Sequence, residues 1–152
     1  MSKVVLTGDD ILTINDRVLS DFAEGAVAVL EFPNDLTSMN VGKNGNAIIT
    51  LNEMGKVANL TLRVLVGSAD DIYFNSLLSL LKKGLPYFPL MYGQFVKILG
   101  DGSGNVYKST FNLINGVFTV QPGTSEDKSG AVDQAVSVWT IAFSDAPRTI
   151  GQ

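Results

Sequence analysis

The 152-residue sequence contains no cysteine and no histidine. Without these side chains the chain cannot form disulfides, bind zinc through its usual ligands, or use a thiol or an imidazole in catalysis. Charged residues are also scarce, because they make up 17% of the chain, against about 25% in an average soluble domain. A surface with so few charges indicates that other subunits cover part of it.

An excess of positive charge and long apolar runs are missing as well. The chain has 11 Lys and Arg residues against 15 Asp and Glu residues, which gives a formal net charge of −4. This is the wrong sign for binding phosphates, so we do not expect sequence-specific nucleic-acid binding. No stretch approaches the roughly 20 apolar residues of a membrane span, and residues 1–10 lack the apolar region of a signal peptide. We expect a soluble protein made in the cytosol, with no membrane insertion.

The length leaves room for a single domain, 1–152, because a domain typically has about 150 residues. The chain has 15 glycines, and the segments between its turns are rich in β-branched and aromatic residues, which predicts a mainly β fold. The expected strands cover residues 11–14, 17–19, 26–32, 58–66, 92–99, 106–114, 117–121 and 134–143. The pairs Asn15-Asp16 and Asn115-Gly116 tolerate positive φ angles, so each predicts a tight hairpin turn between two of these strands.

Residues 34–56 are more polar than the rest of the chain and centre on a turn signal. Asn44-Gly45 is a strong turn signal, and it joins two arms, 38–43 and 46–52, into a long polar ribbon with few core residues on one arm. We expect this segment to protrude from the domain.

One helix is predicted, over residues 68–83. Ser68 and Asp71 have the spacing of a capping box, with Asp in place of the usual Glu, and Gly84 follows as a C-terminal stop. The expected core-facing stripe consists of Ile72, Tyr73, Leu77, Leu80 and Leu81, widened by Phe74 and Leu78.

No segment of the sequence matches a known nucleotide-binding, metal-binding or catalytic motif in full. The glycine-rich segment 100–105 matches no nucleotide-binding pattern, and Val106 stands where a calcium loop needs glycine. The adjacent acids Asp9-Asp10 would point to opposite faces of a strand, and Asp70-Asp71 would cap the helix. We therefore expect no catalytic residues, no metal centre, no cofactor and no enzyme activity.

Self-assembly is the physical inference from the strands. Both faces of 26–32 are mostly apolar, and the strand at 134–143 would expose an apolar face or an unpaired edge, which monomers avoid. The alternative is a monomeric ligand-binding β-sandwich. It would need exposed aromatic residues along a groove, and Tyr87, Phe88 and Tyr92 lie close in sequence, although the flanking prolines favour packing at the edge of the core.

Several segments carry a resemblance, and they run in order along nearly the whole chain, from about residue 12 to residue 148. They are Phe32-Pro33-Asn34-Asp35-Leu36, Gly42-Lys43-Asn44-Gly45-Asn46, Asn52-Glu53-Met54-Gly55-Lys56, Leu62-Arg63-Val64 with Gly67-Ser68-Ala69-Asp70-Asp71, and Gln134-Ala135-Val136-Ser137-Val138. Together they resemble the tail tube proteins of contractile-tailed bacteriophages. The resemblance implies a β-sandwich or partial barrel with one flanking α-helix, forming hexameric rings.

The same resemblance implies a structural role in a virion. The rings would stack into a helical tube inside a contractile sheath, and DNA would be ejected through the lumen without specific binding. The implied partners are the tail sheath, baseplate and tail terminator proteins, with a tape measure protein in the lumen, and assembly would take place in the host cytoplasm. The alternative is the tube of a phage-derived contractile device, such as a bacteriocin, whose subunits would assemble in the same way.

The resemblance also implies roles for particular residues. The ribbon would be a loop that stacks one ring on the next, and residues 146–152 would form a C-terminal arm that contacts other subunits through Arg148 and Ile150. Glu31 is the residue expected to face the lumen, which the acidic net charge suggests is anionic. The expected stacking residues are Met39, Asn40, Lys43, Asn44, Asn46, Asn52, Glu53 and Lys56.

Overall fold

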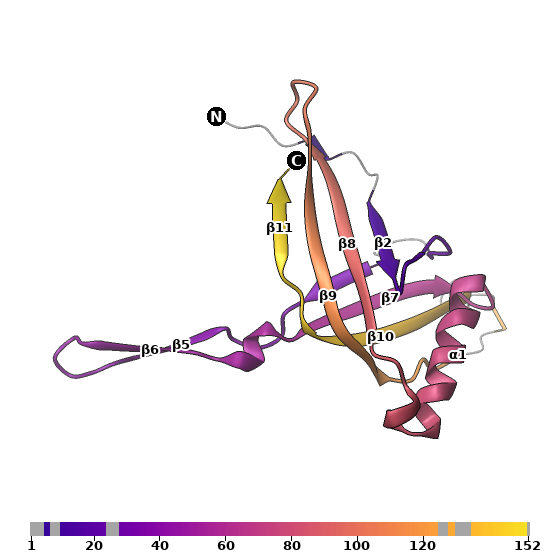
Figure 1. The fold of residues 1–152 in the computed structure, drawn as a ribbon, viewed down its shortest axis with the longest axis horizontal. Helices are drawn as coiled ribbons and strands as arrows, with labels where there is room; N and C mark the ends of the chain where they lie inside the picture. Colours follow the sequence, from indigo (N-terminus) through magenta and orange to yellow (C-terminus); the bar gives the residue numbers. More distant parts are fainter. Residues whose placement is uncertain (1–4, 7–9, 24–27, 125–127, 130–134, 152) are drawn as a thin grey trace.

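A strongly curved sheet of nine antiparallel strands forms the body of the described chain (Figure 1). The computed structural model describes residues 5–6, 10–23, 28–124, 128–129 and 135–151. The elements are β1 (Val5–Leu6), β2 (Ile11–Ile14), β3 (Arg17–Val18), β4 (Ala28–Glu31), β5 (Thr37–Val41), β6 (Ala47–Leu51), η1 (Glu53–Lys56), β7 (Ala58–Leu65), α1 (Ala69–Lys83), η2 (Leu85–Tyr87), β8 (Met91–Gly100), β9 (Val106–Val120), β10 (Val136–Asp145) and β11 (Arg148–Gly151).

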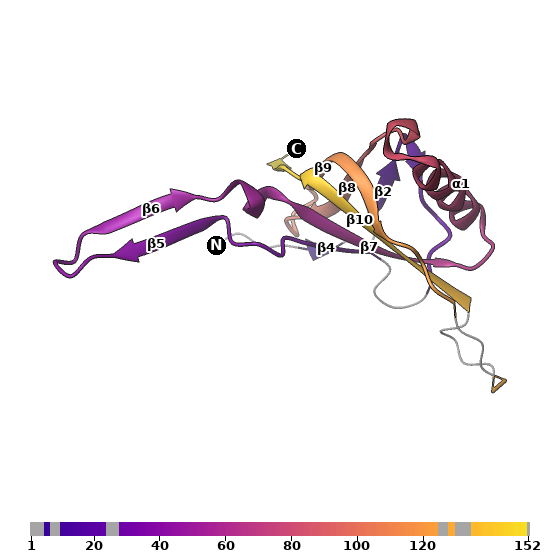
Figure 2. The same ribbon diagram turned by 90° about the horizontal axis from the view of Figure 1, so that it is seen from below.

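The sheet runs in the order β3-β2-β8-β9-β10-β7-β4, with β1 added to β8 and β11 added to β9. Its curvature folds it into two layers, in which β8 and β9 cross over β7 and β10 (Figures 1 and 2). Helix α1 lies at one end of the body, and the β5–β6 ribbon projects from the other. The expected mainly β fold with one flanking helix is confirmed for the described residues. Residues 26, 27 and 134 of the expected strands lie outside them, as does Asp9.

Strand β9 belongs to both layers and corrects one prediction. Asn115-Gly116 does not form a hairpin turn, because β9 runs without a break through both residues. Asn115 has a φ of 55°, and the register between β8 and β9 shifts between Met91 and Gly93. The pair therefore makes a β-bulge where β9 passes from one layer to the other. A Cβ on Gly116 would lie 2.4 Å from the Phe143 ring, so this crossing point needs glycine.

The core lies between the two layers and beneath α1. Strand β7 alternates regularly, with Ala58, Leu60, Leu62 and Val64 buried. The opposite end of the core is aromatic, because Phe74, Phe118 and Trp139 pack with ring centroids 5.1–6.1 Å apart. Each large side chain that is fully buried contributes about 1.5–3 kcal/mol, so this cluster stabilises the attachment of α1 to the sheet.

Helix α1 begins as the sequence predicts, and its core-facing stripe is confirmed except at Ile72. The Ser68 hydroxyl accepts a hydrogen bond from the backbone N–H of Asp71 at 3.3 Å. Ile72, however, is 64% exposed, whereas Phe74 and Leu78 are buried. Leu77 is buried as well, and Tyr73, Leu80 and Leu81 pack partly buried against the core. Ile72 lies about 200° round the helix from Phe74, because successive residues are about 100° apart.

The hairpin of β2 and β3 is confirmed, with φ angles of 52° and 63° at Asn15 and Asp16. It is held against α1 by Asp70, which is 1% exposed. Asp70 accepts hydrogen bonds from the Arg17 Nε at 3.0 Å and from the backbone N–H groups of Ser20 and Asp21 at 2.9 and 3.0 Å. Burial alone would raise the pKa of Asp70, but these donors outweigh it and hold the pKa below the ordinary value.

Candidate assembly interface

Strands β5 and β6 form a separate two-stranded sheet that projects away from the body (Figures 1 and 2). Every residue of both strands is exposed. The backbone N–H of Gly42 donates to the Asn46 carbonyl at 2.7 Å, and the N–H of Gly45 donates to the Gly42 carbonyl at 2.9 Å. Gly45 has a φ of 82°. The turn signal at Asn44-Gly45 therefore corresponds to a three-residue hairpin loop with glycine at its left-handed position.

The register of the ribbon makes it amphipathic. Residues that pair across two antiparallel strands lie on the same face, and successive residues along a strand alternate between faces. Met39 pairs with Ile49, and Asn40 pairs with Ile48. The polar face therefore carries Ser38, Asn40 and Thr50 together with Ile48. The other face carries Met39, Val41, Ala47, Ile49 and Leu51, which we call the apolar ribbon face, with Thr37 beside Leu51 as its one polar member.

The base of the ribbon is fastened to the body in a fixed direction. The backbone N–H of Asn52 donates to the Leu36 carbonyl at 2.7 Å, and the side-chain amide of Asn34 donates to the Met54 carbonyl at 3.3 Å. Gly55 is buried, and a Cβ added to it would lie 2.3 Å from the Leu36 Cα. Two backbone segments therefore touch at this point, and only glycine permits it.

A groove lies beside the base of the ribbon, with a volume of about 630 Å³. Its apolar lining includes Phe32, Leu36, Leu51 and Phe111. The Arg148 guanidinium lies over the Phe111 ring, 5.4 Å from its centroid. Leu51 belongs both to this groove and to the apolar ribbon face, so the two surfaces are continuous.

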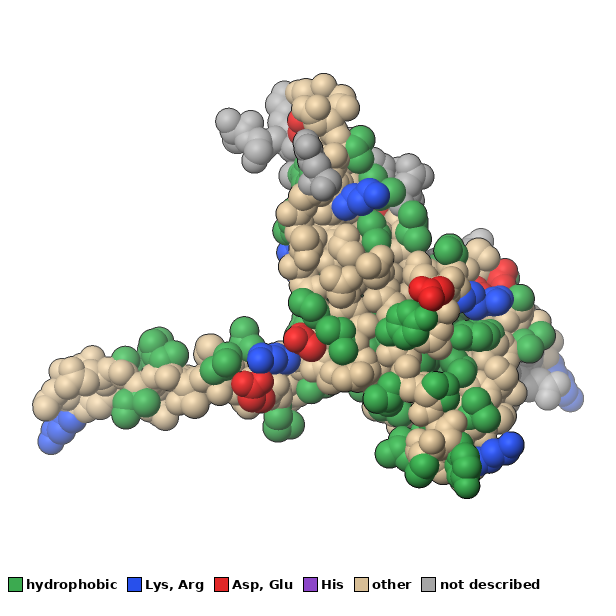
Figure 3. Space-filling model, in the orientation of Figure 1, with side chains coloured by type: hydrophobic (Ala, Val, Ile, Leu, Met, Phe, Trp, Pro, Cys, Tyr) green, Lys and Arg blue, Asp and Glu red, His purple; other side chains and the backbone are tan. Residues whose placement is uncertain are grey.

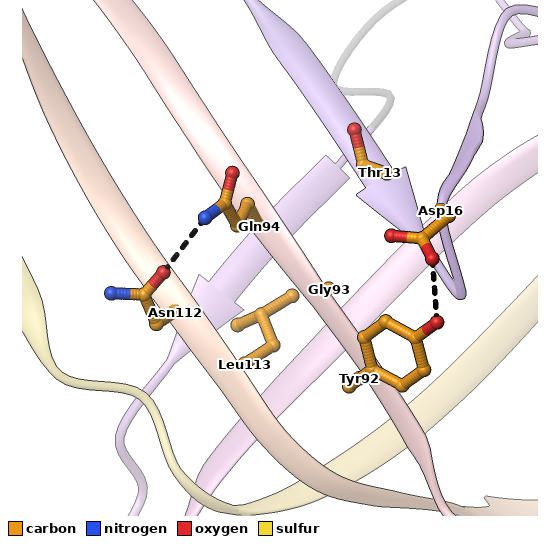
Figure 4. Close-up of a pocket in the computed structure, with 7 residues that line it drawn as sticks. All are labelled: Thr13, Asp16, Tyr92, Gly93, Gln94, Asn112 and Leu113. Carbon is orange, nitrogen blue, oxygen red and sulfur yellow. Dashed lines mark hydrogen bonds between the residues drawn. The ribbon is translucent and has the colours of Figure 1, made fainter.

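A second, polar pocket of about 390 Å³ lies on the outer side of β2, β8 and β9 (Figure 4). The Gln94 side-chain amide donates to the Asn112 Oδ1 at 3.1 Å, and the Tyr92 hydroxyl donates to the Asp16 Oδ2 at 2.7 Å. The hydrogen bond to Asp16 raises the pKa of Tyr92. These polar groups bind one another, and the arrangement contains no nucleophile paired with a base.

Other signals for chemistry do not converge either. Within the described residues, no three His, Cys, Asp or Glu side chains come close enough to hold a metal ion. Phe88 is buried, whereas Tyr87 is exposed at η2 and Tyr92 lines the polar pocket, so the three aromatic residues do not share one site. In the same part of the chain, no helix has both the length and the apolar character of a membrane span.

The structure places the expected stacking residues along the ribbon. Met39 and Asn40 lie in β5 on opposite faces, and the others follow outward to the turn or back to the base. At the base the Lys56 ammonium pairs with the Glu53 carboxylate at 2.8 Å, and the hydrogen bond from this partner raises the pKa of Lys56. Sequence reasoning missed Val41, Ile49 and Leu51. Two adjacent isoleucines hide the alternation of β6 until the register is known.

The expected arm and lumen residues lie elsewhere on the body. Arg148 and Ile150 belong to β11, which pairs with β9 of the same chain. The Arg148 Nε donates to the Ser109 hydroxyl at 2.9 Å, and Ile150 is 55% exposed. Glu31 is exposed at the end of β4, opposite Asn59 of β7.

Comparison with known proteins gives a structural match. No family model matches the sequence, and no curated protein matches it. A similar fold occurs in a chain of the cryo-EM structure of an extracellular contractile injection system, the PVC sheath-tube complex in its extended state. The TM-score is 0.60 and the sequence identity is 15%, and the alignment covers 92% of this chain and 87% of that chain. At this identity the likeness establishes the fold, which agrees with the expected tail-tube-like class.

Proposed function

We propose that this chain is a structural subunit of the hollow tube in a contractile tail or a contractile injection device. The observation that carries the proposal is the fold match to a chain of a sheath-tube complex, because the alignment leaves little of either chain out. The two aligned chains are thus of similar size, and the likeness extends over most of each.

The exposed ribbon supports a subunit that polymerises. A two-stranded ribbon by itself is marginally stable in water, and the apolar ribbon face would gain stability by binding another copy. A contact between two different surfaces of two copies gives a closed ring if the rotation between copies closes, and an open filament if it does not. Closed contacts around the axis and open contacts along the axis together make a tube. We assign the stacking of rings to the ribbon and lateral contacts within a ring to the edges of the curved sheet.

The finer features of the proposal rest on the sequence resemblance. They are six subunits per ring, a surrounding sheath, a lumen through which DNA passes in a phage tail, and a role for the C-terminal residues around β11 in contacts between subunits. A phage tail and a phage-derived device differ in what they deliver, and the subunit physics is the same in both. The protein has no enzymatic role in either.

Electron microscopy of the concentrated purified protein, combined with sedimentation, tests the proposal. We expect hollow rods or rings with sixfold symmetry, whose fraction rises with protein concentration. A monomer at every concentration, even after addition of particle fragments that expose a tube end, would contradict a tube and favour the monomeric ligand-binding sandwich. Particles isolated from producing cells separate the two kinds of tube. Tailed particles with a DNA-filled capsid indicate a phage, and tails without a capsid indicate a device.

A further inference from the structure

The apolar ribbon face has a composition that suits a docking surface. Along the ribbon, charged residues occur only at the tip, where Lys43 lies, and at the base, where Asp35 lies and Glu53 pairs with Lys56. The stretch between them is about 17 Å long, since a strand rises about 3.4 Å per residue. Met39, Ile49 and the rest of this face therefore form an uncharged strip of surface. Burying such a strip requires no charged group to lose its water.

A second exposed apolar surface lies below α1. Leu85, Tyr87 and Leu90 are 64%, 67% and 51% exposed, and we call these three residues the apolar knob. Two prolines, at 86 and 89, restrict its backbone. Phe88, which lies between them, is buried and packs edge to face on Phe118 at 5.9 Å. The knob is thus rigidly presented, and Figure 3 shows hydrophobic side chains gathered at this end of the molecule.

The ribbon and the knob lie at opposite ends of the molecule (Figure 1). A contact between them cannot form within one chain, and between copies it joins two different surfaces, so every added copy presents a new ribbon and a new knob. We propose that the apolar ribbon face of one copy binds the apolar knob of a second copy. This inference rests on the proposed function and names the surface that receives the ribbon.

Charge sets the direction of the contact. Lys82 and Lys83 end the helix directly before the knob, and Lys43 stands at the ribbon tip. Like charges repel at short range, so the ribbon lies across the knob with its side rather than meeting it with its tip. A second copy is favoured over a lipid surface because a copy supplies one knob for every ribbon, in a position that lets the contact repeat.

The absence of cysteine allows a clean cross-linking test. Ile49→Cys and Tyr87→Cys variants, with tags of different size, are mixed, assembled under reducing conditions and then oxidised. We expect disulfide-linked heterodimers of this pair at least tenfold more often than with either control. Thr50→Cys places the thiol on the polar face of the ribbon, and Asn75→Cys places it on an exposed position of α1.

Each outcome separates the contact from the proposed function. Tubes that form without the Ile49–Tyr87 cross-link would overturn the knob as the receiving surface and leave the tube intact. Cross-linked chains without tubes would support the contact and contradict the tube. If the unmodified chain forms no tubes and the variants give no cross-links, both proposals fail.

Discussion

Ile48 and Ile49 are adjacent in β6, yet they lie on opposite faces of the ribbon. Their exposed fractions are similar, 69% and 63%, so replacing either one with serine has nearly the same effect on the isolated subunit. If the apolar ribbon face is buried in the assembled tube, Ile49→Ser weakens assembly and Ile48→Ser does not.

The structure gives the size of the effect. Full burial of an isoleucine side chain is worth about 1.5–3 kcal/mol, and Ile49 is 63% exposed, so most of its surface remains to be buried. Losing that burial costs about 1–2 kcal/mol per contact, and desolvating the serine hydroxyl adds about 1 kcal/mol. A total of about 2–3 kcal/mol raises the critical concentration for tube formation about 30- to 150-fold.

Sedimentation of serial dilutions measures this critical concentration, and thermal unfolding of the same samples verifies that the subunit is folded. The matched variant Ile48→Ser should stay within about threefold of the unmodified chain, because exposed substitutions usually change free energies by no more than about 0.5 kcal/mol. Equal shifts for the two variants, or a larger shift at Ile48, would refute the assignment of the faces.

Three further predictions follow from the same geometry. Gly55→Ala forces the ribbon base away from the Leu36 backbone at a cost of about 1–3 kcal/mol, so we expect a re-aimed ribbon and loss of tubes by electron microscopy. Deleting residues 39–53 should leave a folded subunit, by circular dichroism, that does not polymerise. Asp70→Asn should lower the free energy of unfolding by about 2–4 kcal/mol at pH 7, because it removes the buried partner of Arg17.

The three predictions have distinct controls. For Gly55 the control is Gly42→Ala near the ribbon tip, where an added Cβ would lie 3.5 Å from the Asn46 carbonyl oxygen, an ordinary contact distance; an equal loss of tubes there would contradict a special role for the base. Tubes of normal length from the deletion variant would refute the stacking role. For Asp70 the control is pH. Its native pKa is lowered, so its stabilisation is present above the ordinary carboxyl value of 3.8 and is lost as the pH falls through the native pKa. The difference in the free energy of unfolding between the unmodified chain and Asp70→Asn should therefore become smaller at acidic pH.

Local signals in the sequence predicted the elements that local physics controls. The Ser68 cap and the turn at Asn15-Asp16 appear where short-range hydrogen bonds and positive φ angles require them. Asn115-Gly116 carries a similar signal but forms a bulge, because β9 pairs with both β8 and β10 across that point. The strands that pair with β9 at this point are distant from it in sequence, so the local sequence pattern does not predict the pairing.

The candidate site divides in the same way. A ribbon at residues 34–56 was predictable, since Asn44-Gly45 is a strong turn signal and one arm has few core residues. Which face of the ribbon is apolar was not, because Ile48 and Ile49 occupy both phases of the alternation and only the register with β5 separates them. Asp70 was missed for a related reason. Beside Asp71 it looks like part of a helix cap, and its partner Arg17 lies 53 residues away.

Folding and assembly depend on different residues of this chain. Within the described residues, the buried core cluster includes no member of β5 or β6, so the body can fold without the ribbon being covered. The apolar ribbon face then remains available until a second copy buries it, and burial of apolar surface rather than refolding drives association. It follows that substitutions on the ribbon should change the concentration at which tubes form while leaving the melting temperature of the subunit nearly unchanged, and that core substitutions such as Trp139→Ala should lower the melting temperature.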